Sequence, residues 1–201
     1  MRLGRITTAA ALGLGALVGL SGPPAQAGYT VTLAQQGPNV VATGSGSIDL
    51  TDLTIEFLAG GVPGIVPSSQ LINTGPPAQL TGYGGISGPT NFGSGGVTFA
   101  DAGVGDLVGL AGNGELVVPR GYVSGDPLSD SSTYDNKTIA SLGATPGTYV
   151  WTWGTGEDAD SFTLVIPAAA VPEPSGLLLL PLGLVGVVAA RRYRPARATG
   201  D

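Results

Sequence analysis

The chain has 201 residues and a formal net charge of −6, and only 11% of its residues are charged. It contains neither cysteine nor histidine, which excludes disulfides, thiolate-bound zinc, a cysteine nucleophile and any histidine-dependent catalytic triad. The chain also carries too few basic residues for the positively charged surface that binds nucleic acids, so we expect no nucleic-acid partner.

Residues 1–27 have the three parts of a secretory signal peptide in the expected order. These parts are a basic start, an apolar run and a small-residue cleavage site, at Arg2 and Arg5, Ile6 to Leu20, and Ala25, Ala27 and Gly28. The apolar run is too short and too rich in glycine for a permanent membrane span. The alternative, a buried amphipathic helix, is disfavoured because the run has no polar face. We therefore expect signal peptidase to release a mature chain that begins at Gly28.

Residues 28–170 are expected to form a secreted β-rich domain, because their apolar residues alternate with polar ones at the period of a strand. The clearest sets are Tyr29, Val31 and Leu33; Ile48, Leu50, Leu53, Ile55 and Phe57; Tyr149, Trp151 and Trp153; and Phe162, Leu164 and Ile166. Glycine- and proline-rich breakers separate these runs at short intervals. The pattern predicts an all-β fold, an antiparallel β-sandwich, with a partly open barrel as the alternative.

Three connections have local signals of their own. Asn113-Gly114 lies between apolar runs and predicts a two-residue hairpin turn. The loop from Gly154 to Asp160 joins two patterned runs, so we expect those runs to pair as a hairpin. Residues Thr138 to Leu142 are suited to a single helical turn.

Tyr149, Trp151 and Trp153 are the most conspicuous aromatic set, and they share one face of a predicted strand. Aromatic faces stack on sugar rings, which makes this set a candidate for glycan contact. Aromatic side chains also fill the core of a sandwich. We favour the core interpretation, because residues on one strand face share a single environment.

The acidic residues of the middle region form two loose groups, and clustered loop carboxylates are suited to Ca²⁺. The groups are Asp126, Asp130 and Asp135, and Glu157, Asp158 and Asp160. Neither group has the spacing of an EF-hand loop, and solvated loop acids are the interpretation we favour. No other cofactor is expected.

A glycosidase would need two of these carboxylates at a fixed separation, and the sequence does not say which pair converges. No nucleophile elbow, phosphate-binding loop or dinucleotide fingerprint is present. We therefore expect a domain that is not an enzyme.

The C-terminal residues combine a short box, an apolar run and a basic cluster. The box is Val171, Pro172, Glu173 and Pro174, residues 176–190 carry no charge, and the cluster is Arg191, Arg192, Arg194 and Arg197. A helix of fifteen residues is about 22 Å long, which is shorter than the roughly 30 Å hydrocarbon core of a membrane. The long side chains of the flanking arginines can reach the membrane surface and cover part of the difference. The arginines place this end in the cytoplasm, and residues 198–201 form a short tail.

These three parts together resemble the PEP-CTERM sorting signal, which is also known as the ice-binding protein C-terminal domain. The resemblance covers residues 171–197 and implies a Gram-negative envelope or biofilm protein whose tail is recognised near the box by an exosortase. An ordinary single-span anchor is the alternative. The threonines of the middle region share no regular spacing, so we expect no ice-binding face.

The sequence thus predicts a protein exported across the inner membrane, anchored there, and then sorted to the cell surface or extracellular matrix. Its partners would be signal peptidase, exosortase and an exopolysaccharide. The β domain would be structural or adhesive; the alternatives are a glycan- or calcium-binding module and, less favoured, a glycan-active enzyme.

Overall fold

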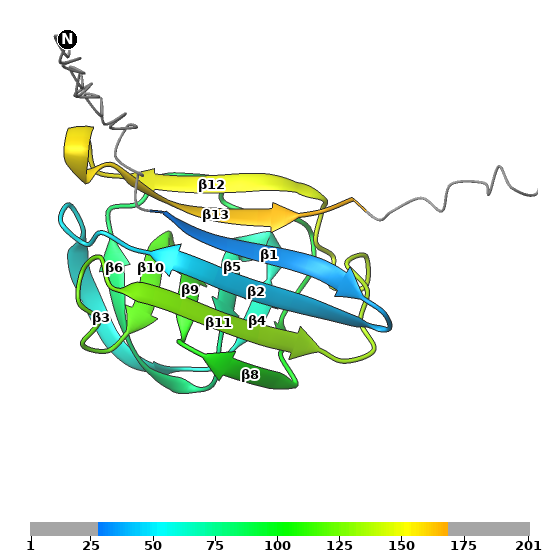
Figure 1. The fold of residues 1–201 in the computed structure, drawn as a ribbon. Helices are drawn as coiled ribbons and strands as arrows, with labels where there is room; N and C mark the ends of the chain where they lie inside the picture. The colour runs from blue at the N-terminus through cyan, green and yellow to red at the C-terminus, as the bar shows by residue number, and fades with distance from the viewer. Residues whose placement is uncertain (1–27, 169–201) are drawn as a thin grey trace, which may run out of the picture.

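The computed structural model describes residues 28–168, which form two β-sheets packed face to face (Figure 1). The first sheet has the strand order β12 (Gly147–Trp153), β13 (Asp160–Ile166), β1 (Tyr29–Gln36), β2 (Asn39–Ser47), β11 (Pro127–Tyr134) and β8 (Ala102–Gly105). The second has the order β3 (Thr54–Gly61), β6 (Ala78–Gly84), β10 (Glu115–Pro119), β9 (Val108–Ala111), β5 (Leu71–Thr74), β4 (Gly64–Val66) and β7 (Thr98–Phe99). Two single 3₁₀ turns, η1 (Pro67–Ser69) and η2 (Gly156–Asp158), complete the described elements.

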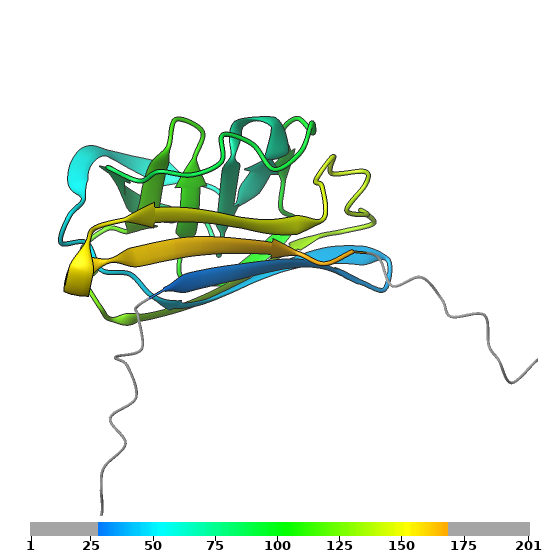
Figure 2. The ribbon, with the colours of Figure 1, turned by 90° about the horizontal axis from the view of Figure 1, so that it is seen from above.

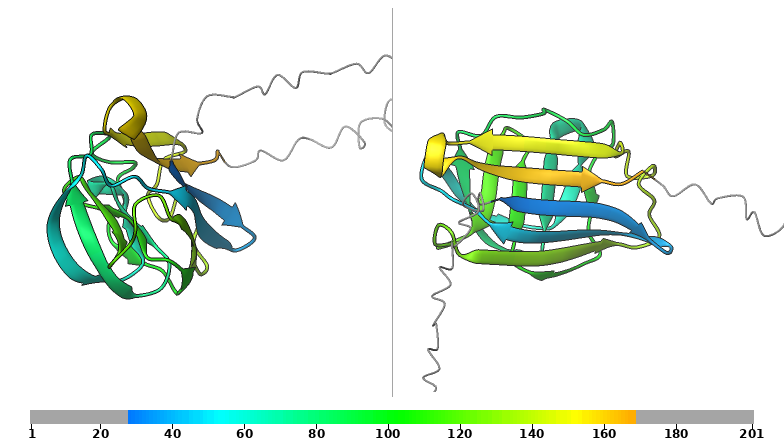
Figure 3. Two further views of the ribbon diagram at one scale, coloured as in Figure 1. Left: turned by 60° about the vertical axis from the view of Figure 1, so that its left-hand side comes forward. Right: turned by 45° about the horizontal axis from the view of Figure 1, so that its top comes forward.

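The all-β prediction is confirmed, and two stacked sheets fit the predicted sandwich (Figure 3). The expectation of purely antiparallel pairing is wrong at one place, because β1 pairs in parallel with β13. Tyr29 lies opposite Phe162, so the described chain enters at one end of the first sheet and leaves at the other (Figure 2). Between residues 28 and 168 no helix has the length and apolar character that a membrane crossing requires. The predicted signal and anchor helices lie outside the described residues.

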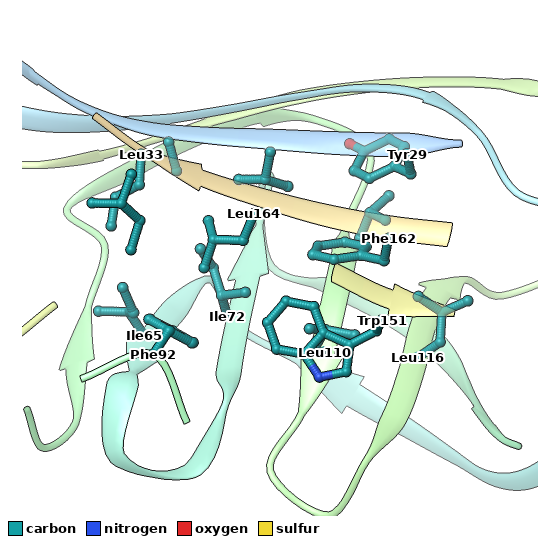
Figure 4. Packing of buried hydrophobic residues seen from close by; sticks show 14 of the residues in the cluster. Tyr29, Leu33, Ile65, Ile72, Phe92, Leu110, Leu116, Trp151, Phe162 and Leu164 are labelled. Carbon is teal, nitrogen blue, oxygen red and sulfur yellow. The ribbon is translucent and has the colours of Figure 1, made fainter. Parts of the chain in front are cut away.

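The core lies between the two sheets and is made by the alternating residues of their facing sides. From the first sheet, β1, β12 and β13 contribute Tyr29, Val31, Leu33, Trp151, Trp153, Phe162, Leu164 and Ile166, all buried. Ile65, Ile72, Leu110 and Leu116 of the second sheet pack against them (Figure 4). Burial of this apolar surface is the main stabilising contribution to such a fold. The predicted inward faces of these three strands are therefore confirmed.

The predicted alternation from Ile48 to Phe57 does not hold throughout. Ile48 is buried, but it lies in the connection after β2 rather than in a strand. A register shift between Ile55 and Phe57 marks a bulge in β3. Because an extra residue in a strand reverses the faces that follow, Phe57 packs with Leu80 and Val117 and is half-buried, whereas Ile55 lies opposite Tyr83 and is 60% exposed.

The three predicted connections form with one change. Strands β9 and β10 pair as a hairpin, but the loop has three residues, Gly112–Gly114, and Gly114 takes a left-handed φ of 84°. This is the geometry in which a turn is followed by a glycine bulge. Strands β12 and β13 pair antiparallel as expected. Leu142 N donates to Thr138 O at 3.0 Å, which closes the single predicted helical turn.

Candidate functional site

The aromatic residues of β12 point into the core. Trp151 is 1% exposed and Trp153 is 5% exposed. Their indole Nε1 atoms donate to the carbonyl oxygens of Pro89 at 2.8 Å and Asp49 at 2.7 Å. Tyr149 is half-buried and packs edge-on against Phe92, with ring centroids 6.0 Å apart. The core interpretation is therefore confirmed for the two tryptophans, and the predicted glycan contact of Tyr149, Trp151 and Trp153 stays a prediction.

The first acidic group is spread along one strand. Asp126 precedes β11, Asp130 lies buried in its middle, and Asp135 follows it. At about 3.3 Å per residue the outer two are roughly 30 Å apart, so the three carboxylates cannot share an ion. In the second group Glu157 and Asp158 are exposed on η2, whereas Asp160 is buried. Within residues 28–168 no three acidic side chains come together as a metal site, so neither predicted calcium site is assembled.

Asp49 and Asp160 are in contact, and their pKa values shift in opposite directions. Hydrogen bonds from Thr51 lower the pKa of Asp49, whereas burial raises the pKa of Asp160. Glycosidases use carboxyl groups whose pKa values are separated in this way. Here, however, the Asp160 carboxylate accepts from the backbone N–H groups of Asp49 and Ser161, both at 2.6 Å. The pair therefore holds the connection after β2 against β13.

A second buried polar contact joins β1 to β11 across β2. The Tyr29 hydroxyl donates to Asp130 Oδ2, and burial raises the pKa of both groups. The contact needs Gly44 on the strand between them, because a Cβ there would lie 2.3 Å from the Tyr29 hydroxyl oxygen. The other oxygen, Asp130 Oδ1, is buried without a hydrogen-bond partner in the described structure.

Two apolar cavities and one of mixed lining lie on the surface of the described residues. The first, of about 390 Å³, lies over the outer side of the second sheet and is lined by Phe57, Leu80 and Val117. That side is the outer one because the neighbours of Val117 in β10, Leu116 and Val118, belong to the core. The second cavity, of about 400 Å³, lies beside Phe99 and Pro77.

The third cavity, of about 470 Å³, is the one with a mixed lining. It lies where the β9–β10 loop and the segment 86–90 meet above Trp151. The buried side chain of Gln70 forms part of its wall. No sequence signal marks Gln70, because its partner Trp151 comes 81 residues later. No local sequence pattern predicts the Tyr29–Asp130 contact either, since 101 residues separate the two side chains.

Comparisons with protein-family models, with curated proteins and with solved structures give no match to this chain. The predicted cleavage site at Ala25, Ala27 and Gly28 borders the described residues, of which Gly28 is the first. The predicted sorting box, Val171 to Pro174, and the arginine cluster lie outside the described residues.

Proposed function

We propose that this chain is a secreted, exosortase-sorted protein of the cell surface or exopolysaccharide matrix, with a structural or adhesive β domain that is not an enzyme. The observation that carries the proposal is the position of one folded domain between two segments that the sequence predicts to be topogenic. Strand β1 begins at Tyr29, directly after the predicted cleavage before Gly28. Strand β13 ends at Ile166, five residues before the box begins at Val171.

The route of the protein follows from these segments. Signal peptidase removes residues 1–27 during export across the inner membrane of a Gram-negative bacterium. Residues 176–190 then hold the chain in that membrane, with Arg191 and its neighbours in the cytoplasm. An exosortase recognises the box and passes the domain to the surface or the matrix.

The place of β13 in its sheet supports a structural role. Beyond this strand the chain continues toward the predicted anchor, so a pull on the tail acts along β13. The strand is paired on both sides, over seven residue pairs with β12 and four with β1. Ladder hydrogen bonds run across the strands, so an axial pull loads many of them together in shear. A domain tied to a cell by this strand is therefore suited to bearing tension.

Cell fractionation of a variant carrying Pro172→Ala, Glu173→Ala and Pro174→Ala tests the sorting step. We expect the triple variant to accumulate in the inner membrane, whereas the wild-type protein reaches the surface or medium. Pro167→Ala is the matched control, because this exposed proline lies just outside the box. Exosortase sorting would be contradicted if the triple variant were released from the cell to the same extent as the wild type and had the same molecular weight.

A further inference from the structure

Gln70 has an unusual backbone conformation. Its φ is 55°, in the left-handed region, and Asn136 is the other non-glycine residue of the described chain with a positive φ. A glutamine in this region is strained, and such residues persist where surrounding contacts hold them, often at binding sites. The Gln70 side chain is only 5% exposed, so its surroundings fix both the backbone and the carboxamide.

The orientation of the Gln70 carboxamide is set by Trp151. The indole Nε1 donates to Gln70 Oε1 at 3.3 Å and to Pro89 O at 2.8 Å. The acceptor oxygen is thereby turned toward the indole, which leaves Nε2 as the free donor. Nε2 lies beside Gly114, where an added Cβ would be 3.5 Å from it, and no described hydrogen bond uses it. A buried side chain therefore presents one unused donor to the cavity.

The rest of the lining is neutral. Hydroxyl and amide groups come from Ser87, Thr90 and Asn113, and apolar surface comes from Ile86 and Trp151. Glycines form the remaining wall, so that a ligand can approach the backbone closely. The volume of about 470 Å³ falls within the range of about 300–1,000 Å³ typical of small-molecule sites. Several neutral polar groups around a small apolar surface match a sugar ring, and the absence of charged side chains from this lining disfavours phosphates and uronic acids.

We propose that this cavity binds a neutral sugar residue of a polysaccharide, with Gln70 Nε2 donating a hydrogen bond to a sugar oxygen. The buried carboxamide, held by Trp151 with its donor unused, is the observation that carries the assignment. This inference deepens the proposed function and takes its biological context from it. Binding is measured on the purified full chain, however, so it succeeds or fails independently of sorting.

Nuclear magnetic resonance provides a direct test, because the chain contains two tryptophans and only Trp151 lines the cavity. The full chain, ¹⁵N-labelled and held in detergent micelles, is titrated to millimolar concentration with cellotriose, laminaritriose, N,N′,N″-triacetylchitotriose and trigalacturonic acid. We expect at least one neutral trisaccharide to shift the indole signal of Trp151 and to leave that of Trp153 in place. The acidic trisaccharide should shift neither. The variant Trp151→Phe assigns the two signals.

Two substitutions test the role of the carboxamide. Gln70→Gly accepts the left-handed conformation and removes the donor, so we expect about tenfold weaker binding without a loss of thermal stability. Asn113→Ala changes an exposed loop residue of the lining and should weaken binding severalfold. Asn136→Gly, at the other strained position, is the matched control and should bind like the wild type.

Three results would each overturn the proposal. One is a folded wild-type chain in which none of the neutral trisaccharides shifts the Trp151 signal. Another is full affinity in both Gln70→Gly and Asn113→Ala. The third is equally tight binding of trigalacturonic acid, which would refute the assignment to a neutral sugar.

Discussion

Tyr29 and Tyr134 are both buried on the inner side of the first sheet, but their hydroxyl groups differ in their partners. The Tyr29 hydroxyl donates to Asp130, whereas the Tyr134 hydroxyl has no partner in the described structure. Removing one member of a buried hydrogen bond leaves the other unsatisfied, but removing an unpaired buried hydroxyl relieves a cost. We therefore expect Tyr29→Phe to lower the free energy of unfolding by about 2 kcal/mol and Tyr134→Phe to raise it by about 1 kcal/mol.

Urea denaturation of the two variants measures both effects on one scale. Each variant loses a single hydroxyl from a buried tyrosine, so each is the matched control of the other. Equal losses of stability in the two variants would contradict the hydrogen-bond assignment.

Asp130 should give the fold a characteristic pH dependence. Burial is the largest cause that raises the pKa of Asp130 above its ordinary value of about 3.9. The folded chain then holds this proton more tightly than the unfolded chain does. The contribution of Asp130 to stability is therefore fully present below about pH 4, and it is lost as the pH rises through the pKa of the folded state.

The variant Asp130→Asn keeps the shape of the side chain and removes this titration. In denaturation experiments we expect the difference in unfolding free energy, variant minus wild type, to increase as the pH is raised from 3 to 7. Asp126→Asn, at an exposed residue just before the same strand, is the control. If the difference in unfolding free energy between Asp130→Asn and wild type were constant across this pH range, the Asp130 carboxyl would not be the cause of the pH dependence.

At the scale of elements, the edge strand β12 is covered by the segment 86–90. Ser87 and Thr152 exchange two backbone hydrogen bonds, of 2.9 and 2.8 Å. The approach requires Gly88, because a Cβ there would lie 2.5 Å from Cδ1 of Trp151. We expect Gly88→Val to lower stability by about 1–3 kcal/mol and to speed amide hydrogen exchange at Thr152.

The control for this prediction is Gly96→Val in the same connection. A Cβ at Gly96 would meet no atom within 4 Å, so this variant should leave exchange at Thr152 unchanged. The close packing over Trp151 would be refuted if both valine variants exchanged at the wild-type rate.

How far the sequence predicts these elements depends on the range of the interactions. The alternation in β1, β12 and β13 is local, and it places Leu33, Trp151 and Leu164 on the inner side as expected. The bulge in β3 breaks the same rule, because the residue it adds puts Ile55 and Phe57 on opposite sides of the sheet. The parallel pairing of β1 with β13 has no local signal either, since alternation specifies a face and not a neighbour. The buried position of Gln70 depends likewise on a partner distant in sequence.

At the scale of the whole molecule, the two terminal strands should give the domain a direction-dependent resistance to force. Because β1 and β13 are parallel neighbours, opposite pulls at their outer ends shear the ladder between them. Strands β12 and β13 are antiparallel, with Gly147 opposite Ile166, so a pull at that end opens their pairs one after another. We expect a higher unfolding force in the first geometry.

Optical tweezers can compare the two directions in one domain, because the chain has no native cysteine to compete with introduced handles. Gly28→Cys with Pro167→Cys gives the shear geometry, and Pro146→Cys with Pro167→Cys gives the opening geometry. The tension-bearing role would be contradicted if the two double-cysteine variants unfolded at the same force.

Export is the step on which the proposed function depends, because the β domain must reach the outside of the cell. Intact mass and N-terminal sequence of the protein recovered from the cytoplasm, the envelope and the medium of the source bacterium test it most directly. We expect a chain that begins at Gly28 and is found in the envelope or the medium. A chain that retains residues 1–27 and remains in the cytoplasm would contradict it.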